Sequence, residues 1–347
     1  MEEEDIIGFD ALWESLMKCK HGVTWKDSVA AFLLDGVQNI AKLADDLESG
    51  EYEERPPKFF TITYPKEREI MSINIRDRVY QRSLNDVAIY PVMSKSFIYD
   101  NAACQKGKGA DFGRDRLKCH MQKYYRKFGA DGYILKMDIE KYYASMSHDV
   151  AKEVFKEKLE PFVYERAARI LDVFPGETGF NPGSQIIQIA GISVPDKIDH
   201  YIKERLRVKH YMRYMDDMVV LSDSKEELEM IRDEVSKKFV EIGFRLHPDK
   251  TKITTMKKGV YWLGYYYRLT DTGKVVMTLD PERIKSARRK YKRMAKKVAA
   301  GKLSREKVDE SYRCWRNHAS KGDGWKMLKN MDAYYASLWE GSDAQDH

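Results

Sequence analysis

The spacing of apolar residues along the chain predicts a protein built from both helices and strands. Over residues 6–50 the apolar positions recur every three or four residues, as expected for amphipathic helices that end at Gly50. Residues 58–75 are predicted to form two short strands around a turn at 65–67. A further helix is expected over 76–90, so this first part of the chain is mainly helical with one hairpin.

The middle of the chain is predicted to alternate between helix and strand. From residue 101 onward the pattern predicts a glycine-rich basic loop (101–113), a helix (115–128), a strand (133–139), a mostly helical stretch (147–171), a turn-rich loop (176–183) and a second helix (184–206). Pro195 lies inside that last helix and is expected to kink or interrupt it, since proline has no amide hydrogen to donate.

The remaining third begins with a predicted hairpin at 209–222. A helix over 225–243 and strands near 252–255 and 260–268 follow, and the pattern from 281 to 338 is helical and basic. The central order of strand, helix, strand, hairpin, helix and strand suits a split βαβ, or ferredoxin-like, sheet with helices on one face. We therefore predict an α+β fold.

The basic charge of the chain is concentrated in one predicted helix. The 347 residues include 61 Lys and Arg against 55 Asp and Glu, a surplus that alone says little about partners. Residues 283–297, however, hold nine basic residues and no acidic one. Such a cluster suits a phosphate backbone, although a charge run by itself is also typical of a solvated helix face.

The cysteines and the hydropathy exclude several classes of protein. The four cysteines, Cys19, Cys104, Cys119 and Cys314, form no Cys-x-x-Cys pair, so neither a zinc site nor a disulfide framework is indicated. The acidic N-terminus has no signal-peptide character, and no apolar run approaches the roughly 20 residues of a membrane helix. We expect a cytoplasmic protein without a membrane partner.

Two adjacent carboxylates, Asp216 and Asp217, lie at the bend of the predicted hairpin. They follow Tyr214 and Met215, and β-favouring residues flank the four-residue motif on both sides. Two anions crowded at a turn repel each other, and folding does not require them there. Their placement is explained if a cation binds between them.

A third carboxylate, Asp138, ends the predicted strand at 133–139. A strand that ends in Asp beside a hairpin carrying Asp-Asp can bring its carboxylate to the same point. Such a cluster can hold two Mg²⁺ ions about 3.5–4 Å apart, and oxygen ligands suit Mg²⁺ better than thiols or imidazoles do. Considered alone, Asp138 is better explained as the N-cap of a helix, and only its combination with the Asp-Asp hairpin favours a metal site.

At these residues the chain resembles the reverse transcriptases, over roughly positions 55 to 270. The resemblance implies a right-hand polymerase, with fingers and an N-terminal helical extension (1–125), a catalytic palm (126–265) and a basic helical thumb (266–347). It implies that Asp138 and Asp216 bind Mg²⁺, with Mn²⁺ as a possible substitute. The backbone carbonyl of Ile139 would join them, and Asp217 would be required at the same site.

Further residues receive roles from the same resemblance. Lys66 and Arg68 would clamp the triphosphate, Tyr143 would reject a 2′-hydroxyl, and Gln188 would lie against the nucleotide or the templating base. Tyr143 is also explained by plain packing, because Tyr142 beside it is aromatic too. The implied template and primer contacts are Lys106, Lys108, Gly183, Tyr214, Met215, Trp262, Gly264, Arg288, Arg289 and Lys292.

The segment 246–253 resembles the lysine-bearing motif of the palm. Lys250 or Lys252 would protonate the leaving pyrophosphate, and the spacing does not choose between them. The implied partners are an RNA template, a DNA or RNA primer and dNTPs.

The segment 182–188 resembles most closely the reverse transcriptases of diversity-generating retroelements. Gly183 and Gln188 fit the pattern of that group, while Pro182 and Ile187 depart from it. Membership would imply error-prone cDNA synthesis, a structured non-coding RNA and a small basic accessory protein. The short chain also leads us to expect neither an RNase H nor an endonuclease domain.

Three other functions stay open at this point. An antiviral defence reverse transcriptase would share the same motifs. An RNA-binding protein that kept the fold without activity is disfavoured by the complete set of Asp138, Asp216 and Asp217. An RNA-dependent RNA polymerase is disfavoured by the bulk of Tyr143, because such enzymes require a smaller neighbour for the 2′-hydroxyl.

Overall fold

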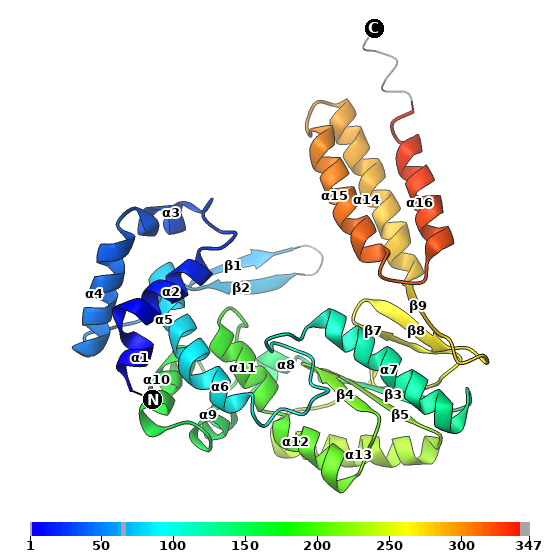
Figure 1. Ribbon diagram of the computed structural model, residues 1–347, viewed down its shortest axis with the longest axis horizontal. Helices are drawn as coiled ribbons and strands as arrows, with labels where there is room; N and C mark the ends of the chain where they lie inside the picture. The colour runs from blue at the N-terminus through cyan, green and yellow to red at the C-terminus, as the bar shows by residue number, and fades with distance from the viewer. Residues whose placement is uncertain (1, 64–66, 341–347) are drawn as a thin grey trace. The chain divides into compact units, whose positions relative to one another are not determined.

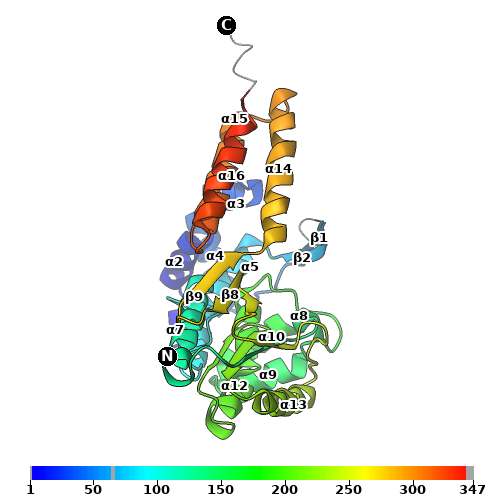
Figure 2. The ribbon, with the colours of Figure 1, turned by 90° about the vertical axis from the view of Figure 1, so that its right-hand side faces the viewer.

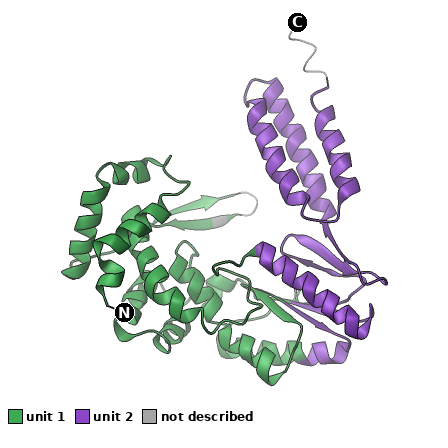
Figure 3. Ribbon diagram, viewed as in Figure 1, with its two compact units in different colours: residues 1–109, 137–218, 231–251 green, residues 110–136, 219–230, 252–347 purple. Residues whose placement is uncertain are grey.

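The computed structural model describes residues 2–63 and 67–340, and the chain forms two compact units (Figure 3). Unit 1 comprises residues 1–109, 137–218 and 231–251, and unit 2 comprises residues 110–136, 219–230 and 252–347. The described residues contain no helix that is both long and apolar enough to cross a membrane.

Unit 1 begins with a small group of amphipathic helices (Figure 1). They are α1 (Glu4–Ile7), α2 (Phe9–Cys19), α3 (Asp27–Leu34) and α4 (Gly36–Glu48). Their apolar faces bury Leu12, Leu16, Ile40 and Leu43, which agrees with the periodicity over 6–50. The helical prediction is confirmed for this segment, which forms four separate helices.

The hairpin predicted over 58–75 is present in unit 1. Strands β1 (Lys58–Ile62) and β2 (Arg68–Ser72) pair in antiparallel register, with Phe59 opposite Met71. The following segment forms α5 (Ile75–Ser83), the π-helix η1 (Leu84–Ile89) and α6 (Tyr90–Met93) in place of a single helix. Pro91 near the start of α6 has no amide hydrogen, which removes one regular helical bond at this junction.

A second group of helices in unit 1 surrounds the nearly buried helix α11. These helices are α8 (Tyr142–Ser145), α9 (His148–Lys156), α10 (Pro161–Asp172), α11 (Gln185–Ser193), α12 (Asp196–His200) and the π-helix η2 (Tyr201–Arg205). Pro195 lies between α11 and α12, so the interruption expected over 184–206 is confirmed. The side chain of Ser184 caps α11 by accepting a hydrogen bond from the amide of Ile186.

A four-stranded sheet contains the predicted strand and hairpin. Its strands are β3 (Tyr133–Asp138), β4 (Tyr211–Tyr214), β5 (Asp217–Ser222) and β6 (Lys252–Thr255), in the order β4-β5-β3-β6. Strands β3 and β6 are antiparallel, with Leu135 opposite Ile253. Helix α13 (Lys225–Glu241) follows β5, and the last two residues of β3 and the first two of β5 belong to unit 1.

Unit 2 contains a second sheet. Helix α7 (Ala110–Phe128) precedes it, and strands β7 (Val260–Trp262), β8 (Tyr265–Leu269) and β9 (Val275–Leu279) form an antiparallel meander. The sequence analysis did not predict β9. It pairs with β8 across a turn that contains Gly273, whose φ of 79° suits glycine.

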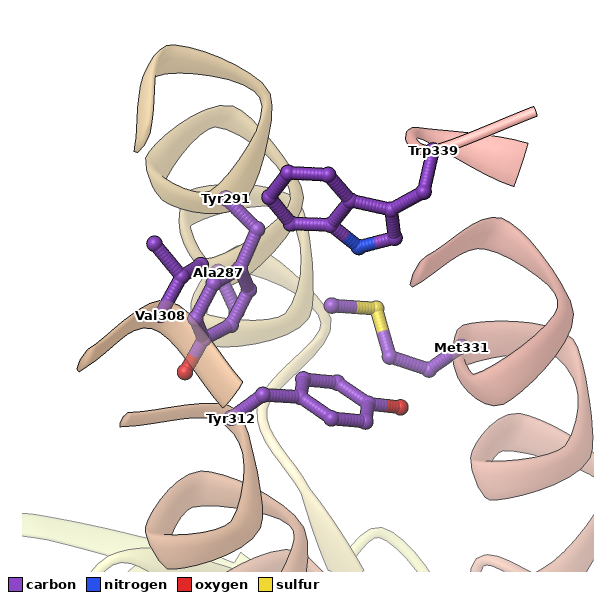
Figure 4. Packing of buried hydrophobic residues seen from close by; sticks show 6 residues of the cluster. All are labelled: Ala287, Tyr291, Val308, Tyr312, Met331 and Trp339. Atoms are coloured by element: carbon purple, nitrogen blue, oxygen red, sulfur yellow. The ribbon is translucent and has the colours of Figure 1, made fainter. Parts of the chain in front are cut away.

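The C-terminal part of unit 2 is a bundle of three helices, α14 (Pro281–Ala299), α15 (Arg305–Ala319) and α16 (Trp325–Ser337). Figures 1 and 2 show them side by side. Their core is largely aromatic (Figure 4), and the rings of Tyr312 and Tyr335 stack with centroids 3.8 Å apart. The basic helical pattern predicted from 281 to 338 is therefore confirmed as a packed bundle.

Candidate active site

The two adjacent carboxylates lie at a tight turn between β4 and β5. Met215 and Asp216 connect the strands, and Met215 has a φ of 55°, in the left-handed region that few residues other than glycine adopt. The guanidinium of Arg213 donates a hydrogen bond of 3.2 Å to the carbonyl of Met215. This hydrogen bond thus stabilises the strained turn.

The end of β3 brings Asp138 to the same turn. The amide of Ile139 donates to the carbonyl of Asp216 at 3.2 Å, which joins two segments far apart in the sequence. The carbonyl of Asp138 accepts from the amide of His247 at 2.7 Å. The backbone of Asp138 is therefore fixed on one side by the hairpin and on the other by the segment after α13.

The acidic groups of this turn interact electrostatically. Burial, together with the charges of Asp217 and Asp138, raises the pKa of Asp216 to about 6, even though its own backbone amide and Lys250 act in the opposite direction. The carboxylate of Asp138 is only 6% exposed. Proximity of these groups therefore makes full ionisation unfavourable without a compensating positive charge.

Lys250 supplies one such charge. Its ammonium lies 2.8 Å from Oδ1 of Asp138, and this hydrogen bond is the main cause that raises the pKa of Lys250. The lysine side chain is about half exposed, whereas the aspartate is buried. The ammonium thus reaches the acidic turn from the solvent side and is free to leave it.

The donor set of this turn matches the chemistry of a hard divalent cation. Within residues 2–63 and 67–340, no three His, Cys, Asp or Glu side chains are already arranged to hold a metal ion. Carboxylate oxygens of Asp138 and Asp216 and the carbonyl of Ile139 are, however, the ligand types that Mg²⁺ and Mn²⁺ take. A cation among them would offset the burial and the repulsion that raise the pKa of Asp216.

Two adjacent tyrosines beside the turn have different environments. Tyr142 is 4% exposed and donates a hydrogen bond to the carbonyl of Gly191. Tyr143 is half-buried, and its hydroxyl lies 3.9 Å from the sulfur of Met215. A β-carbon added at Gly191 would lie 2.8 Å from the hydroxyl oxygen of Tyr143, so the glycine leaves room for this ring.

Gln188 and Gly183 lie at the beginning of α11 and in the loop before it. The carboxamide of Gln188 accepts a hydrogen bond of 3.7 Å from the thiol of Cys104, and Ile187 beside it is fully buried. A β-carbon at Gly183 would lie 2.6 Å from the carbonyl of Met71 in β2. This glycine is therefore needed for the close approach of the loop to the hairpin.

Three cavities of unit 1 share lining residues, and we refer to them together as the basic groove. Arg78 lines the first, of about 110 Å³, and also the second, of about 250 Å³. Arg82 and Gln188 line both the second cavity and the third, which is also about 250 Å³. Basic side chains of the groove are Lys18, His21, Lys26, Lys58, Arg78, Arg82 and Lys106.

The predicted nucleotide and template residues near the fingers lie in different environments. Lys66 lies outside the described residues, and Arg68 begins β2. Lys106 is exposed, and its amide donates to the hydroxyl of Tyr90. The ammonium of Lys108 instead donates to the backbone carbonyls of Tyr99 and Asn101 and so supports the loop.

Several predicted contacts belong to unit 2. Lys252 begins β6 opposite Lys136, whereas Lys250 lies at the acidic turn of unit 1, so the structure separates the two lysines that the spacing left equivalent. Trp262 is fully buried and supports its sheet from inside. Arg288, Arg289 and Lys292 are exposed on α14.

Gly264 forms the two-residue turn between β7 and β8 together with Leu263. Their φ values are 92° and 44°, so both residues adopt left-handed conformations. The guanidinium of Arg114 donates to the carbonyl of Leu263 at 3.1 Å. This turn resembles the acidic turn in being held by a buried arginine.

The sequence analysis missed three residues that shape the acidic turn. Arg213 and Asp199 form a fully buried ion pair, and Gly191 accommodates Tyr143. A charged residue inside an otherwise apolar strand was a visible signal for Arg213. Asp199 and Gly191 gave none, because their roles depend on partners that only the folded chain brings near.

Comparison with known proteins agrees with this geometry. A family model described as reverse transcriptase (RNA-dependent DNA polymerase) matches residues 64–267. No curated protein matches the chain significantly.

Solved telomerase structures share part of the fold. Telomerase from Candida albicans in complex with the TWJ fragment of telomeric RNA has a TM-score of 0.50 and 13% identity, and the match covers 83% of this chain and 56% of that one. Apo telomerase from Candida tropicalis, truncated from the C-terminal domain, has a TM-score of 0.48 and 12% identity, with coverages of 65% and 55%. The chain thus spans about half the length of these telomerases.

Proposed function

The chain belongs to the reverse transcriptase (RNA-dependent DNA polymerase) family, since the family model covers residues 64–267, and we propose that its acidic turn adds dNTPs to a primer 3′-hydroxyl by a two-metal mechanism. The enzyme is an RNA-directed DNA polymerase, a nucleotidyltransferase. The observation that carries the proposed mechanism is the bond between the amide of Ile139 and the carbonyl of Asp216, which places Asp138 beside the turn.

Asp138, Asp216 and the carbonyl of Ile139 would hold the divalent ions, and Asp217 would complete the acidic site. Bound Mg²⁺ would lower the pKa of the primer hydroxyl and neutralise the charge of the triphosphate and pyrophosphate. Burial of Asp138 and the fixed backbone of Ile139 and Asp216 would orient these oxygens before substrate arrives.

Lys250 is the proton donor that the geometry favours for the leaving pyrophosphate. Its ammonium already reaches the acidic turn, 2.8 Å from Asp138, and its half-exposed side chain can swing toward an incoming phosphate. Lys252, in a paired strand of unit 2, has no such contact with the aspartates among the described interactions. Proton donation from Lys250 would leave a neutral amine that solvent can recharge.

Tyr143 is proposed to select the sugar of the nucleotide. The hydroxyl end of its ring lies close to Gly191 and to the sulfur of Met215, and both neighbours limit how far the ring can move. A ring fixed in this way would clash with a 2′-hydroxyl and accept a deoxyribose. The buried Tyr142 is part of the core and supports this position with its own bond to Gly191.

The basic groove of unit 1 is proposed to guide the template strand. Single-stranded nucleic acids bind through a groove of positive charge that follows the phosphates. Gln188 lines the second and third cavities of the groove, and its carboxamide would face the templating base or the incoming nucleotide. Lys106 and Tyr90 line the third cavity and would add a phosphate contact and a stacking surface.

We assign fingers to about residues 1–125, palm to 126–265 and thumb to 266–347. The exposed basic residues Arg288, Arg289 and Lys292 of α14 would contact the duplex in that arrangement. Within the family, Gly183 and Gln188 favour the reverse transcriptase of a diversity-generating retroelement, with an RNA and a basic accessory protein as partners. The buried Ile187 departs from the pattern of that group, and Gln188 beside it is half-buried.

Primer extension on an RNA template tests the proposed mechanism. Wild-type protein with Mg²⁺ and dNTPs should extend the primer, and Asp216→Asn should abolish extension while leaving the fold intact. Asp233→Asn, the same change on the exposed face of α13, is the matched control and should be fully active. Extension by Asp216→Asn at the wild-type rate would contradict the proposal.

A further inference from the structure

We propose that Arg213 and Asp199 are a positioning pair that fixes the catalytic turn, an inference that rests on the proposed function of that turn. Both residues lie in unit 1, and neither is expected to touch substrate. Their effect would pass through the carbonyl of Met215, the residue directly before Asp216.

The ion pair between these residues is fully buried. Arg213 is 0% exposed and Asp199 is 1% exposed. Nε of Arg213 lies 2.8 Å and 2.9 Å from the two carboxylate oxygens, and Nη2 lies 2.6 Å from Oδ2. The hydroxyl of Tyr211 donates to Oδ1 of Asp199 at 2.5 Å. The carboxylate is therefore fully occupied and cannot rotate.

Stability does not account for such a pair. Removing two charges from water costs several kcal/mol per ion, and apolar residues of similar volume often stabilise a core equally well or better. The pair is buried in the core, and Arg213 also bonds to the carbonyl of the fully buried Ile192. A specific geometric task, which an apolar pair cannot perform, explains its presence.

Arg213 also donates hydrogen bonds to groups outside the ion pair, and these bonds together with Asp199 connect three elements. Nη1 donates to the carbonyl of Met215 at 3.2 Å, and Nη2 donates to the carbonyl of Ile192 in α11 at 2.9 Å. Asp199 anchors the guanidinium to α12. One planar side chain thus joins the turn to two helices, which a lysine with its single ammonium cannot do.

The backbone of Arg213 is held as firmly as its side chain. Its amide donates to the carbonyl of Asp100 at 3.1 Å, and its carbonyl accepts from the amide of Ala102 at 2.9 Å. The residue is therefore a fixed reference point from which the guanidinium reaches the turn. Met215, with its φ of 55°, would otherwise relax toward an ordinary conformation and carry Asp216 with it.

The same pair also supports the position of Tyr143. Met215 contacts the hydroxyl of Tyr143 through its sulfur, and Ile192, bonded to Arg213, follows Gly191, which receives the tyrosine ring. Loss of the pair should therefore affect both the rate of chemistry and the discrimination between dNTP and NTP. A purely structural pair would affect neither in a variant that stays folded.

An apolar double variant separates positioning from stability. Arg213→Met with Asp199→Leu removes both charges together, so no unpaired charge is left in the core. The melting temperature should stay close to that of the wild type, while kcat for primer extension falls at least tenfold. The KM for primer and template should change less than kcat, because Lys106, Arg288 and Arg289, which are proposed to contact them, are exposed, whereas the pair is buried.

A second ion pair, in which Asp196 is buried and Lys158 is partly exposed, provides the control. The charged atoms of Lys158 and Asp196 are 3.0 Å apart and both residues bond to Ser96, and within the described part of the chain neither residue bonds to Met215 or Asp216. Lys158→Met with Asp196→Leu should leave kcat and the dNTP to NTP ratio unchanged. Arg213→Lys keeps the buried charge but loses the bond to Met215, and it should reduce kcat in the same direction as the double variant.

The outcomes distinguish this inference from the proposed function. If the wild type does not extend primers while binding them, the proposed function fails first. If the wild type is active and the folded apolar double variant or Arg213→Lys retains its kcat, the positioning role is refuted. Failure of both variants to fold would assign the pair to folding and refute the role equally.

Discussion

Gly191→Ala tests whether the space beside Tyr143 controls nucleotide binding. A β-carbon at this position would lie 2.8 Å from the hydroxyl oxygen, 3.1 Å from Cζ and 3.2 Å from Cε1 of the tyrosine. Ordinary carbon contacts begin at about 3.5 Å, so the ring must move by several tenths of an ångström. Tyr142, 5.4 Å away between centroids, and the sulfur of Met215, 3.9 Å from the hydroxyl, restrict where it can go.

Two opposing contributions determine how Gly191→Ala changes the free energy of unfolding. Replacing glycine by alanine inside a helix stabilises it by about 1 kcal/mol, whereas inserting a methyl group into a packed site costs about 1–3 kcal/mol. Without nucleotide the ring can relieve the overlap by shifting away from α11. The net change in the free energy of unfolding should therefore stay within about 1 kcal/mol of zero.

The cost should appear when a nucleotide binds. The sugar would push the ring back against the new methyl group, and a strain of about 1–2 kcal/mol corresponds to a rise of about 5- to 30-fold in the KM for dNTP. Steady-state extension with a homopolymeric RNA template measures this value. Tyr143→Ala combined with Gly191→Ala should restore the KM of Tyr143→Ala alone, because the clash is then absent.

Gly36→Ala is the matched control for the effect of an added methyl group on the KM for dNTP. Its β-carbon would meet Trp13 at 3.6 Å, an ordinary contact, so KM for dNTP should not change. If Gly191→Ala leaves both the KM and the dNTP to NTP ratio at wild-type values, the tyrosine does not border the nucleotide and the reasoning is wrong.

Three further predictions concern single side chains. Lys250→Met should lower kcat about 100-fold or more if the ammonium of Lys250 protonates pyrophosphate, whereas Lys252→Met should leave kcat unchanged. Pre-steady-state primer extension measures both rates. Arg78→Gln should weaken binding of single-stranded RNA and reduce the slope of log K against log salt concentration by about 0.7, whereas Lys237→Gln on α13 should bind like the wild type. Fluorescence titrations measure these slopes, and equal slopes for the wild type and Arg78→Gln would argue against the groove. Leu263→Asn should raise the free energy of unfolding in urea by about 1 kcal/mol, because Asn-Gly suits the left-handed turn in which Leu263 has a φ of 44°. A loss of stability would show that the contacts of the leucine side chain outweigh the relief of backbone strain.

The acidic motif could be predicted from sequence because its signal is local. Two aspartates between runs of β-favouring residues indicate a hairpin bend, and the apolar strand that ends in Asp138 indicates a second ligand. The periodicity also predicted the hairpin β1–β2, the interruption at Pro195 and the terminal basic helices. Each of these features depends on residues close together along the chain.

The contacts that support the turn could not be predicted in the same way. Arg213 and Asp199 are separated by the π-helix η2 and the loop after it, and only the folded chain shows that they face each other. Gly191 acts through the absence of a side chain, which no periodicity records. The choice between Lys250 and Lys252 required the three-dimensional position of Asp138, and strand β9 had to be found from its pairing with β8.

Direct measurement of cation binding tests the central claim that distant carboxylates form one metal site. Titration of Mn²⁺ followed by electron paramagnetic resonance, with and without dNTP, should show bound Mn²⁺ for the wild type. Asp138→Asn and Asp216→Asn should each lose this binding, while Asp233→Asn retains it. Undiminished Mn²⁺ binding by folded Asp138→Asn protein would contradict the account.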